Sequence, residues 1–116
     1  MTLERFLEII NNKEYEKLEY VNQYNTALLF RNNYIDIYTK NGAFIRFRFD
    51  HHVEGFFRMK IKPYCDILFF VPEEDIAVSS HRISEEECMY ETLKELFDQL
   101  KAKIMQEQAD EYSKYF

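Results

Sequence analysis

The sequence predicts a single α+β domain: an antiparallel five- or six-stranded sheet meander with a short N-terminal helix and a long C-terminal helix packed on one face. Apolar residues alternate with other residues over much of positions 28–71, whereas both ends of the chain space them as helices do. Short loops separate the alternating segments, which favours antiparallel neighbours. The chain has 116 residues, so we expect one domain spanning 1–116.

The first element is predicted to be a short helix that ends near residues 11–12. Thr2 is a favourable N-cap residue, and the apolar residues after it follow the spacing i, i+3, i+4, i+7. They are Leu3, Phe6, Leu7 and Ile10. In the segment 15–26 that follows, Leu18 and Tyr20 indicate a strand.

Alternation with a period of two predicts the strands of the sheet. Its apolar positions are Leu28 and Phe30; Ile35 and Ile37; Ile45, Phe47 and Phe49; Phe57, Met59 and Ile61; and Ile67, Phe69 and Val71. A further short edge strand is predicted at residues 76–78.

Turn residues between these segments predict how the strands pair. Asn32-Asn33 suits a two-residue type I′ turn, Gly42 suits the left-handed position of a three-residue loop over 40–42, and a loop is predicted at 63–65. The predicted pairs are Phe30 with Ile35, Leu28 with Ile37, Ile37 with Ile45, Ile35 with Phe47, Asp36 with Arg46, Ile61 with Ile67, Met59 with Phe69, and Lys62 with Asp66.

The C-terminal helix is predicted to begin near Ser84, which forms a capping box with Glu87. Its apolar stripe lies across the core-facing side of the sheet and consists of Met89, Leu93, Leu96, Phe97, Leu100 and Ile104. Residues 106–116 lack this stripe, and we expect them to project or fray.

The outward face of the predicted sheet interleaves aromatic and basic residues, and it is the candidate binding site. The site consists of Tyr34, Tyr38, Phe44, Arg46, Arg48, Phe56, Arg58, Lys60 and Lys62. If residues 43–49 pair with 55–62, cations lie opposite one another, which is unfavourable without a compensating charge. A bound partner would supply it; the alternative source is Asp36, Asp66 and the acidic C-terminal helix.

Charge and composition favour a binding protein. The net charge is −6, yet residues 27–70 carry seven bases and four acids. Because the chain is acidic overall and interface hot spots are rich in Tyr and Arg, we expect a non-catalytic binding or inhibitory protein that docks a protein partner. The residue bias suits a low-GC viral or mobile-element accessory protein that acts against a host nucleic-acid-processing system. The alternatives are a nucleic-acid-binding module that uses the same face and a homodimer through it.

A metal-dependent nuclease or other hydrolase is the third hypothesis. It would centre on Asp36 with Lys60, or on the segment 50–54, which contains His51 and His52 and is expected to be a hairpin loop. The sequence has two glycines and no phosphate-cradling loop or nucleophile elbow. We therefore expect no catalytic residues, metal ligands or cofactor.

The sequence also predicts where in the cell the protein is located. No apolar run approaches the roughly 18 residues of a membrane span, and the first ten residues lack a signal-peptide core. Cys65 and Cys88 are too few for a disulfide framework. These features predict a cytoplasmic protein, in the host cell if it is viral, with reduced cysteines and no membrane partner.

Overall fold

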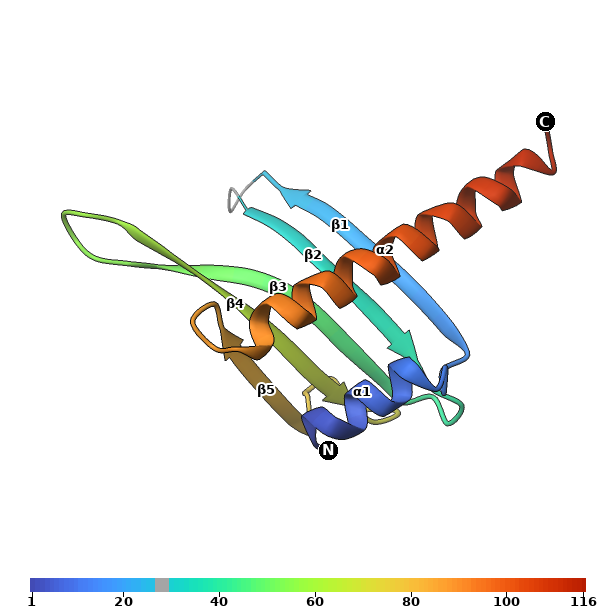
Figure 1. Ribbon diagram of the computed structural model, residues 1–116, viewed down its shortest axis with the longest axis horizontal. Coiled ribbons are helices and arrows are strands. Elements are labelled where there is room, and N and C mark those ends of the chain that lie inside the picture. Colours follow the sequence, from blue (N-terminus) through green and yellow to red (C-terminus); the bar gives the residue numbers. More distant parts are fainter. Residues whose placement is uncertain (27–29) are drawn as a thin grey trace.

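The computed structural model describes residues 1–26 and 30–116. Within them the chain forms two helices and five strands (Figure 1). In chain order these are α1 (Leu3–Asn11), β1 (Lys17–Asn25), β2 (Phe30–Tyr38), β3 (Phe44–Glu54), β4 (Lys60–Phe70), β5 (Ser79–Ser84) and α2 (Met89–Ser113). The predicted α+β class is confirmed.

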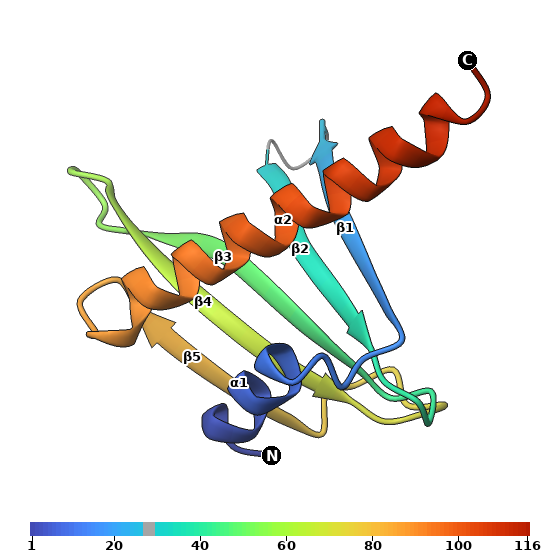
Figure 2. The same ribbon diagram turned by 45° about the vertical axis from the view of Figure 1, so that its right-hand side comes forward.

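The strands form one antiparallel meander in the order β1-β2-β3-β4-β5. Both helices lie on the same face of this sheet, and α2 crosses it diagonally from the β4–β5 side to β1 (Figures 1 and 2). The molecule therefore has two layers. The helix α1 therefore leaves the second face of the sheet uncovered (Figures 1 and 2).

The core lies between the helices and the sheet. The Phe47 ring contacts Phe6 of α1 and Phe97 of α2, with centroid separations of 5.2 and 5.3 Å. All the members of the two predicted helical stripes lie in this layer or at its margin. Thr2 caps α1 as predicted, because its Oγ1 accepts a hydrogen bond from the Arg5 backbone N–H at 3.1 Å.

The predicted turn at Asn32-Asn33 is wrong. Both residues lie inside β2, and Asn33 pairs with Asn22 of β1. The segment 17–25 supplies a long partner strand, so β2 continues through the two asparagines instead of folding back. The predicted partners Phe30 and Ile35 therefore share one strand, and Leu28 lies outside the described residues.

The predicted pairing of β2 with β3 is confirmed. Ile37 pairs with Ile45, and Asp36 pairs with Arg46. Gly42 has φ of +79°, the left-handed conformation that glycine adopts without the steric cost of a side chain.

The predicted loop at 63–65 is wrong, because β4 runs through Pro63 without a break. Pro63 is opposite His51 in the ladder with β3, and its carbonyl oxygen accepts a bond from the Glu85 N–H at 3.2 Å. The N and C=O of one strand residue point to the same side, so the missing N–H of Pro63 faces β5. The ladder with β3 therefore loses no hydrogen bond there.

This change lengthens the β3–β4 hairpin and moves its turn to residues 55–59. Residues 51–62, which we call the arm, are all exposed and project beyond the other strands (Figure 1). The segment 50–54 is thus strand rather than a hairpin loop, and Phe57 and Met59 are exposed rather than buried. The predicted pairs of Ile61 with Ile67, Met59 with Phe69 and Lys62 with Asp66 do not form.

Two boundaries near β5 and α2 also differ from the prediction. The edge strand is Ser79–Ser84 rather than residues 76–78, and Phe69 pairs with Ser79. Ser84 and Glu87 do bond to each other, through the Ser84 N–H at 3.2 Å, but α2 begins later, at Met89. The segment 106–116 remains helical to Ser113, and its side chains are exposed. Neither α1 nor α2 is long and apolar enough to cross a membrane.

Candidate functional site: the open face of the sheet

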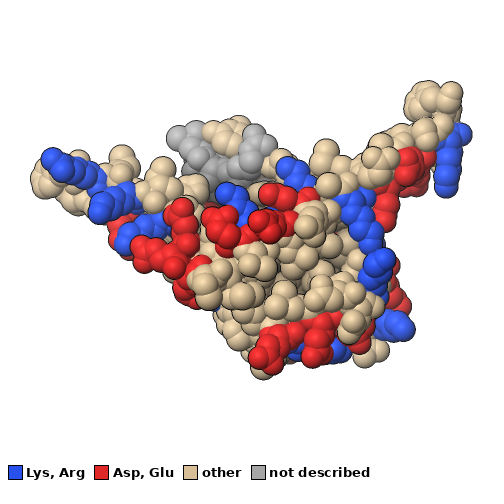
Figure 3. Space-filling view, viewed as in Figure 1, with Lys and Arg blue, Asp and Glu red and all other residues tan. Residues whose placement is uncertain are grey.

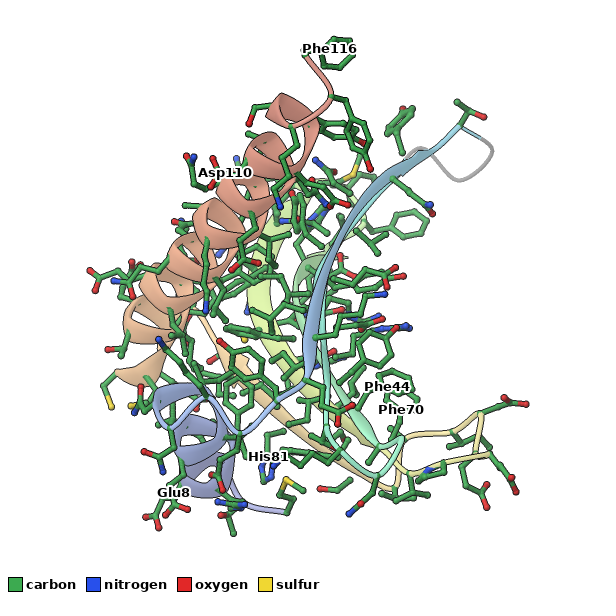
Figure 4. The ribbon with its side chains drawn as sticks, turned by 90° about the vertical axis from the view of Figure 1, so that its right-hand side faces the viewer. Glu8, Phe44, Phe70, His81, Asp110 and Phe116 are labelled. Carbon is green, nitrogen blue, oxygen red and sulfur yellow. The ribbon has the colours of Figure 1, made fainter. Side chains whose placement is uncertain are left out.

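The face of the sheet opposite the helices, which we call the open face, carries a mixed layer of aromatic and charged side chains. Strand alternation places these residues there, because their neighbours at odd spacing point into the core. They are Tyr34, Asp36, Tyr38, Phe44, Arg46, Arg48, Tyr64, Asp66, Leu68, Phe70 and Arg82. Phe44 and Phe70 point away from both helices (Figure 4).

An aromatic row crosses three strands of this face. Phe44 stacks on Phe70 with ring centroids 4.5 Å apart and planes 6° from parallel. Tyr38 lies on the other side of Phe44, at 5.6 Å. Because the three residues are cross-strand neighbours, the sheet itself holds their rings in place.

A buried carboxylate anchors the first arginine of the face. Asp36 is 4% exposed and accepts two bonds from Arg46, to Nε at 2.9 Å and to Nη2 at 3.0 Å. This bidentate geometry fixes the plane of the guanidinium. The Tyr34 ring lies 4.3 Å from the Arg46 Cζ, so the arginine lies between a buried acid and an aromatic face.

A second buried carboxylate, Asp66, holds two arginines. Its Oδ2 accepts a bond from Arg48 at 2.8 Å, and Arg82 donates from Nε at 2.8 Å and from Nη2 at 2.9 Å. Burial by itself would raise the pKa of Asp66, but the hydrogen bonds and charges of Arg82 and Arg48 outweigh it and lower the pKa. Asp66 is therefore ionised in the folded protein at neutral pH, and the Tyr64 ring lies 3.9 Å from the Arg82 Cζ.

These pairs remove the charge problem that the predicted register raised. Arg48 lies opposite Asp66, and Arg46 lies opposite Leu68, so neither arginine has a cation as its neighbour on β4. Of the alternative source of compensation, which was Asp36, Asp66 and the acidic C-terminal helix, the two aspartates pair with these arginines.

The structure divides the predicted site between two places. Tyr34, Tyr38, Phe44, Arg46 and Arg48 lie together on the open face. The four remaining residues are on the arm, away from it: Phe56, Arg58, Lys60 and Lys62. On the arm, the Lys62 Nζ lies 3.1 Å from a Glu54 oxygen.

Arg82 and Tyr64 belong to the open face but were absent from the predicted site. Tyr64 was assigned to a loop, and Arg82 lay outside every predicted strand. The signal that could have revealed Arg82 is the alternation of Ile83 with its polar neighbours in β5, which is short and weakly apolar.

The structure does not assemble the residues of the hydrolase hypothesis. Asp36 is engaged by Arg46 on the open face, whereas Lys60 is on the arm. His51 and His52 are consecutive strand residues, so their rings point to opposite sides, and the His52 Nε2 lies 3.0 Å from a Glu54 oxygen. Among residues 1–26 and 30–116 no three His, Cys, Asp or Glu side chains are grouped to hold a metal ion.

A groove of about 530 Å³ runs between the arm and the segment that joins β5 to α2. Its charged lining mixes both signs: Lys60, Lys62 and Arg82 stand beside Glu54, Glu85 and Glu86. A lining of this kind favours neither an anion nor a cation, so the groove is a weaker candidate than the open face.

No family model, curated protein or solved structure matches the chain. The functional argument therefore depends on the geometry of this chain alone.

Proposed function

We propose that this chain is a non-catalytic binding protein that docks a partner protein through the open face. The observation that carries the proposal is the layer of aromatic rings and arginines held in place by two buried aspartates. Tyr and Arg are the residue types that concentrate binding energy at protein interfaces, and here they gather on one face of the sheet.

The anchoring supports tight binding because little side-chain freedom remains to be lost. Arg46 is held by two hydrogen bonds and a neighbouring ring, and Phe44 is held by its stack with Phe70. Ordering a flexible side chain at an interface costs about 0.5–1.5 kcal/mol. Side chains already fixed in the free protein avoid most of that cost.

The charge balance of the open face supports a protein partner over nucleic acid. Its three arginines face two buried aspartates, and each arginine already donates a hydrogen bond to a carboxylate oxygen. A phosphate backbone would have to compete with these carboxylates for the same donors. A partner that buries the aromatic row and accepts bonds through carbonyl oxygens would not.

The partner chemistry we propose is an apolar protein surface that is bordered by hydrogen-bond acceptors and carries few net charges. The residue bias of the chain suits a viral or mobile element. We therefore propose that the partner is a host protein of nucleic-acid processing and that binding inhibits it.

The test compares capture of host proteins by the tagged wild-type chain, a Tyr34→Ala/Phe44→Ser variant and a Tyr24→Ala control. Tyr24 is an exposed aromatic residue whose strand position places it on the other side of β1. The proposal expects one protein that the wild type and the control retain and the open-face variant loses. With that protein purified, the variant should bind at least about 30-fold more weakly, since one hot-spot residue alone contributes about 2 kcal/mol.

A mixed single-stranded oligonucleotide at low and high salt tests the alternative. Binding that disappears at high salt and is lost in an Arg46→Ala/Arg48→Ala variant would replace the protein partner with nucleic acid. Equal capture by the wild type and the open-face variant would overturn the proposal.

A further inference from the structure

The tip of the arm exposes apolar side chains on all sides. Phe56 and Phe57 are 93% and 94% exposed, and Met59 is 79% exposed, so solvent surrounds each of them almost completely. The two rings lie edge to face with their centroids 5.5 Å apart. Two phenylalanine side chains offer about 300–500 Å² of surface, and an exposed apolar patch of that size marks a contact with a protein or a membrane.

The arm holds this tip clear of the rest of the chain. Neither helix lies beside the turn at 55–59, and α2 ends at the opposite end of the molecule (Figures 1 and 2). Strand residues rise about 3.3 Å each, so the tip lies roughly 17 Å beyond His51 at the base of the arm. A partner protein would cover one side of such a hairpin, whereas a lipid bilayer surrounds an inserted tip completely.

The tip is basic although the chain is acidic. Residues 55–60 contain Arg58, Lys60 and no acid, whereas the whole chain has a net charge of −6. The one acid of the arm, Glu54, lies 3.0 Å from the His52 Nε2 and 3.1 Å from the Lys62 Nζ. Among the described residues neither Arg58 nor Lys60 forms a salt bridge. Basic groups lie on the outer part of the arm and acidic groups near its base (Figure 3), so the tip offers unpaired positive charge beside its apolar surface.

We propose that the tip of the arm inserts into the surface of a membrane that contains anionic lipids. Phe56, Phe57 and Met59 enter the boundary between headgroups and acyl chains, to the depth of about 5–10 Å that interfacial segments reach. The heads of Arg58 and Lys60 stay at the level of the lipid phosphates, because their long stems follow the apolar surface. The rest of the arm holds the acidic body of the chain away from the bilayer.

This contact requires no membrane-spanning segment. At this depth water and lipid phosphates satisfy the backbone groups of the turn, which the hydrocarbon core would leave without partners. The proposal departs from the sequence-based expectation of no membrane partner, because that expectation rested on the lack of a span and a signal peptide. The tip is also separate from the open face, so the proposal does not depend on the proposed function.

Vesicle sedimentation tests the proposal with the full-length chain. The chain should sediment with phosphatidylcholine vesicles that contain about 30% phosphatidylserine and bind pure phosphatidylcholine at least about tenfold more weakly, because the anionic surface attracts its bases. Phe56→Ser/Phe57→Ser should weaken binding at least about tenfold, since affinity scales with the apolar area buried. Arg58→Gln/Lys60→Gln should weaken it about 30-fold, or about fivefold for each base removed.

Two controls match these variants outside the arm. Ile76→Ser removes an apolar side chain that is 79% exposed, and Lys94→Gln/Lys114→Gln removes two exposed bases. Both should bind the anionic vesicles as the wild type does, because neither changes the tip.

Tryptophan fluorescence reports whether the tip itself inserts. The chain contains no tryptophan, so Phe57→Trp introduces a single indole at the tip. Its emission should shift to shorter wavelengths with the anionic vesicles and should be quenched by lipids brominated on their acyl chains. Ile76→Trp, at the control position, should show neither change.

A wild-type chain that does not bind the anionic vesicles would overturn the proposal. Sedimentation that the two arm variants retain would also overturn it, as would emission from Phe57→Trp that the vesicles leave unchanged. If the vesicles are not bound and Phe56→Ser/Phe57→Ser loses a host protein that the wild type captures, the tip belongs to a protein contact instead.

Discussion

Phe44 and Phe70 stack across the β3–β4 pair with their planes 6° from parallel and their centroids 4.5 Å apart. They lie on the side of the sheet that neither helix covers (Figure 4). Phe47, three residues along the same strand, points to the other side and is fully buried. A single strand thus supplies a ring to the core and a ring to the open face.

Alanine at these two positions should separate folding from binding. Phe47→Ala removes a ring that contacts both helices, so we expect the free energy of unfolding to fall by about 3–5 kcal/mol. Phe44→Ala removes mainly a surface stack and should cost about 1 kcal/mol. Urea titration of the two purified variants measures both values. Equal losses would show that the open face is part of the structural core.

Asp66 should be the most sensitive polar residue of the open face. Asp66→Asn removes the charge that Arg48 and Arg82 share, and it leaves the less exposed of them, Arg48, without a carboxylate. Breaking a buried ion pair costs about 3–5 kcal/mol, and the partial exposure of both arginines places the expected loss near about 3 kcal/mol. Glu19→Gln, at an exposed residue whose carboxylate lies 3.6 Å from the Nζ of the exposed Lys17, should change stability by less than about 0.5 kcal/mol. Chemical denaturation at neutral pH compares the two variants.

The same carboxylate should govern part of the acid unfolding. The pKa of Asp66 is lowered from 3.8 in the folded protein, where burial opposes the stronger effect of the two arginines. The folded state therefore binds fewer protons than the unfolded state, and its stabilisation is fully present above the unfolded pKa of 3.8. It is lost as the pH falls below that value.

The difference in stability between the wild type and Asp66→Asn isolates this effect from other titrating groups. We expect the difference to be constant near neutral pH and to shrink as the pH drops below 3.8. A difference that stayed constant into strong acid would show that Asp66 has an ordinary pKa in the folded protein.

The sequence predicted best which residues of each helix and strand are buried. The helical stripes of α1 and α2 and the alternation at Ile35, Ile37, Ile45 and Phe47 all reflect which side of an element meets the core. Where a turn residue had a clear conformational reason, as Gly42 does, the register followed as well. The predicted strand pairing was wrong around Pro63, because the proline was taken as the end of a strand. In β4, Pro63 lies at a position that needs no N–H on the β3 side.

The candidate site was only partly predictable for a related reason. Alternation indicates which side of a strand a residue occupies, and it correctly grouped Tyr34 and Phe44 with Arg46. It does not indicate how far along the strand the neighbouring strands extend. Lys60 and Lys62 were therefore assigned to the open face although they lie on the arm, beyond the body of the sheet.

The two cysteines should differ sharply in reactivity. Cys65 is buried and Cys88 is exposed, and burial, followed by the charge of Asp66, raises the pKa of the Cys65 thiol. The thiolate is the reactive form, so a disulfide reagent at mildly alkaline pH should label Cys88 in the native protein and both cysteines in urea. Rapid native labelling of a Cys88→Ser variant would contradict the buried position of Cys65.

Glycine at the tip of the arm should be essential for the shape of the arm but not for the fold. Gly55 has φ of +104°, and a Cβ there would clash with the Arg58 carbonyl oxygen. Gly55→Ala must therefore open the turn at 55–59. The arm lies outside the core, so global stability should fall by about 1 kcal/mol or less while amide exchange in residues 51–62 accelerates.

Gly42→Ala is the matched control, because its φ is +79° but its Cβ would meet only Pro72 at an ordinary 3.5 Å. That variant should lose about 1 kcal/mol through backbone strain and leave exchange in the arm unchanged. Equal effects of the two substitutions on the arm would contradict the contact with Arg58.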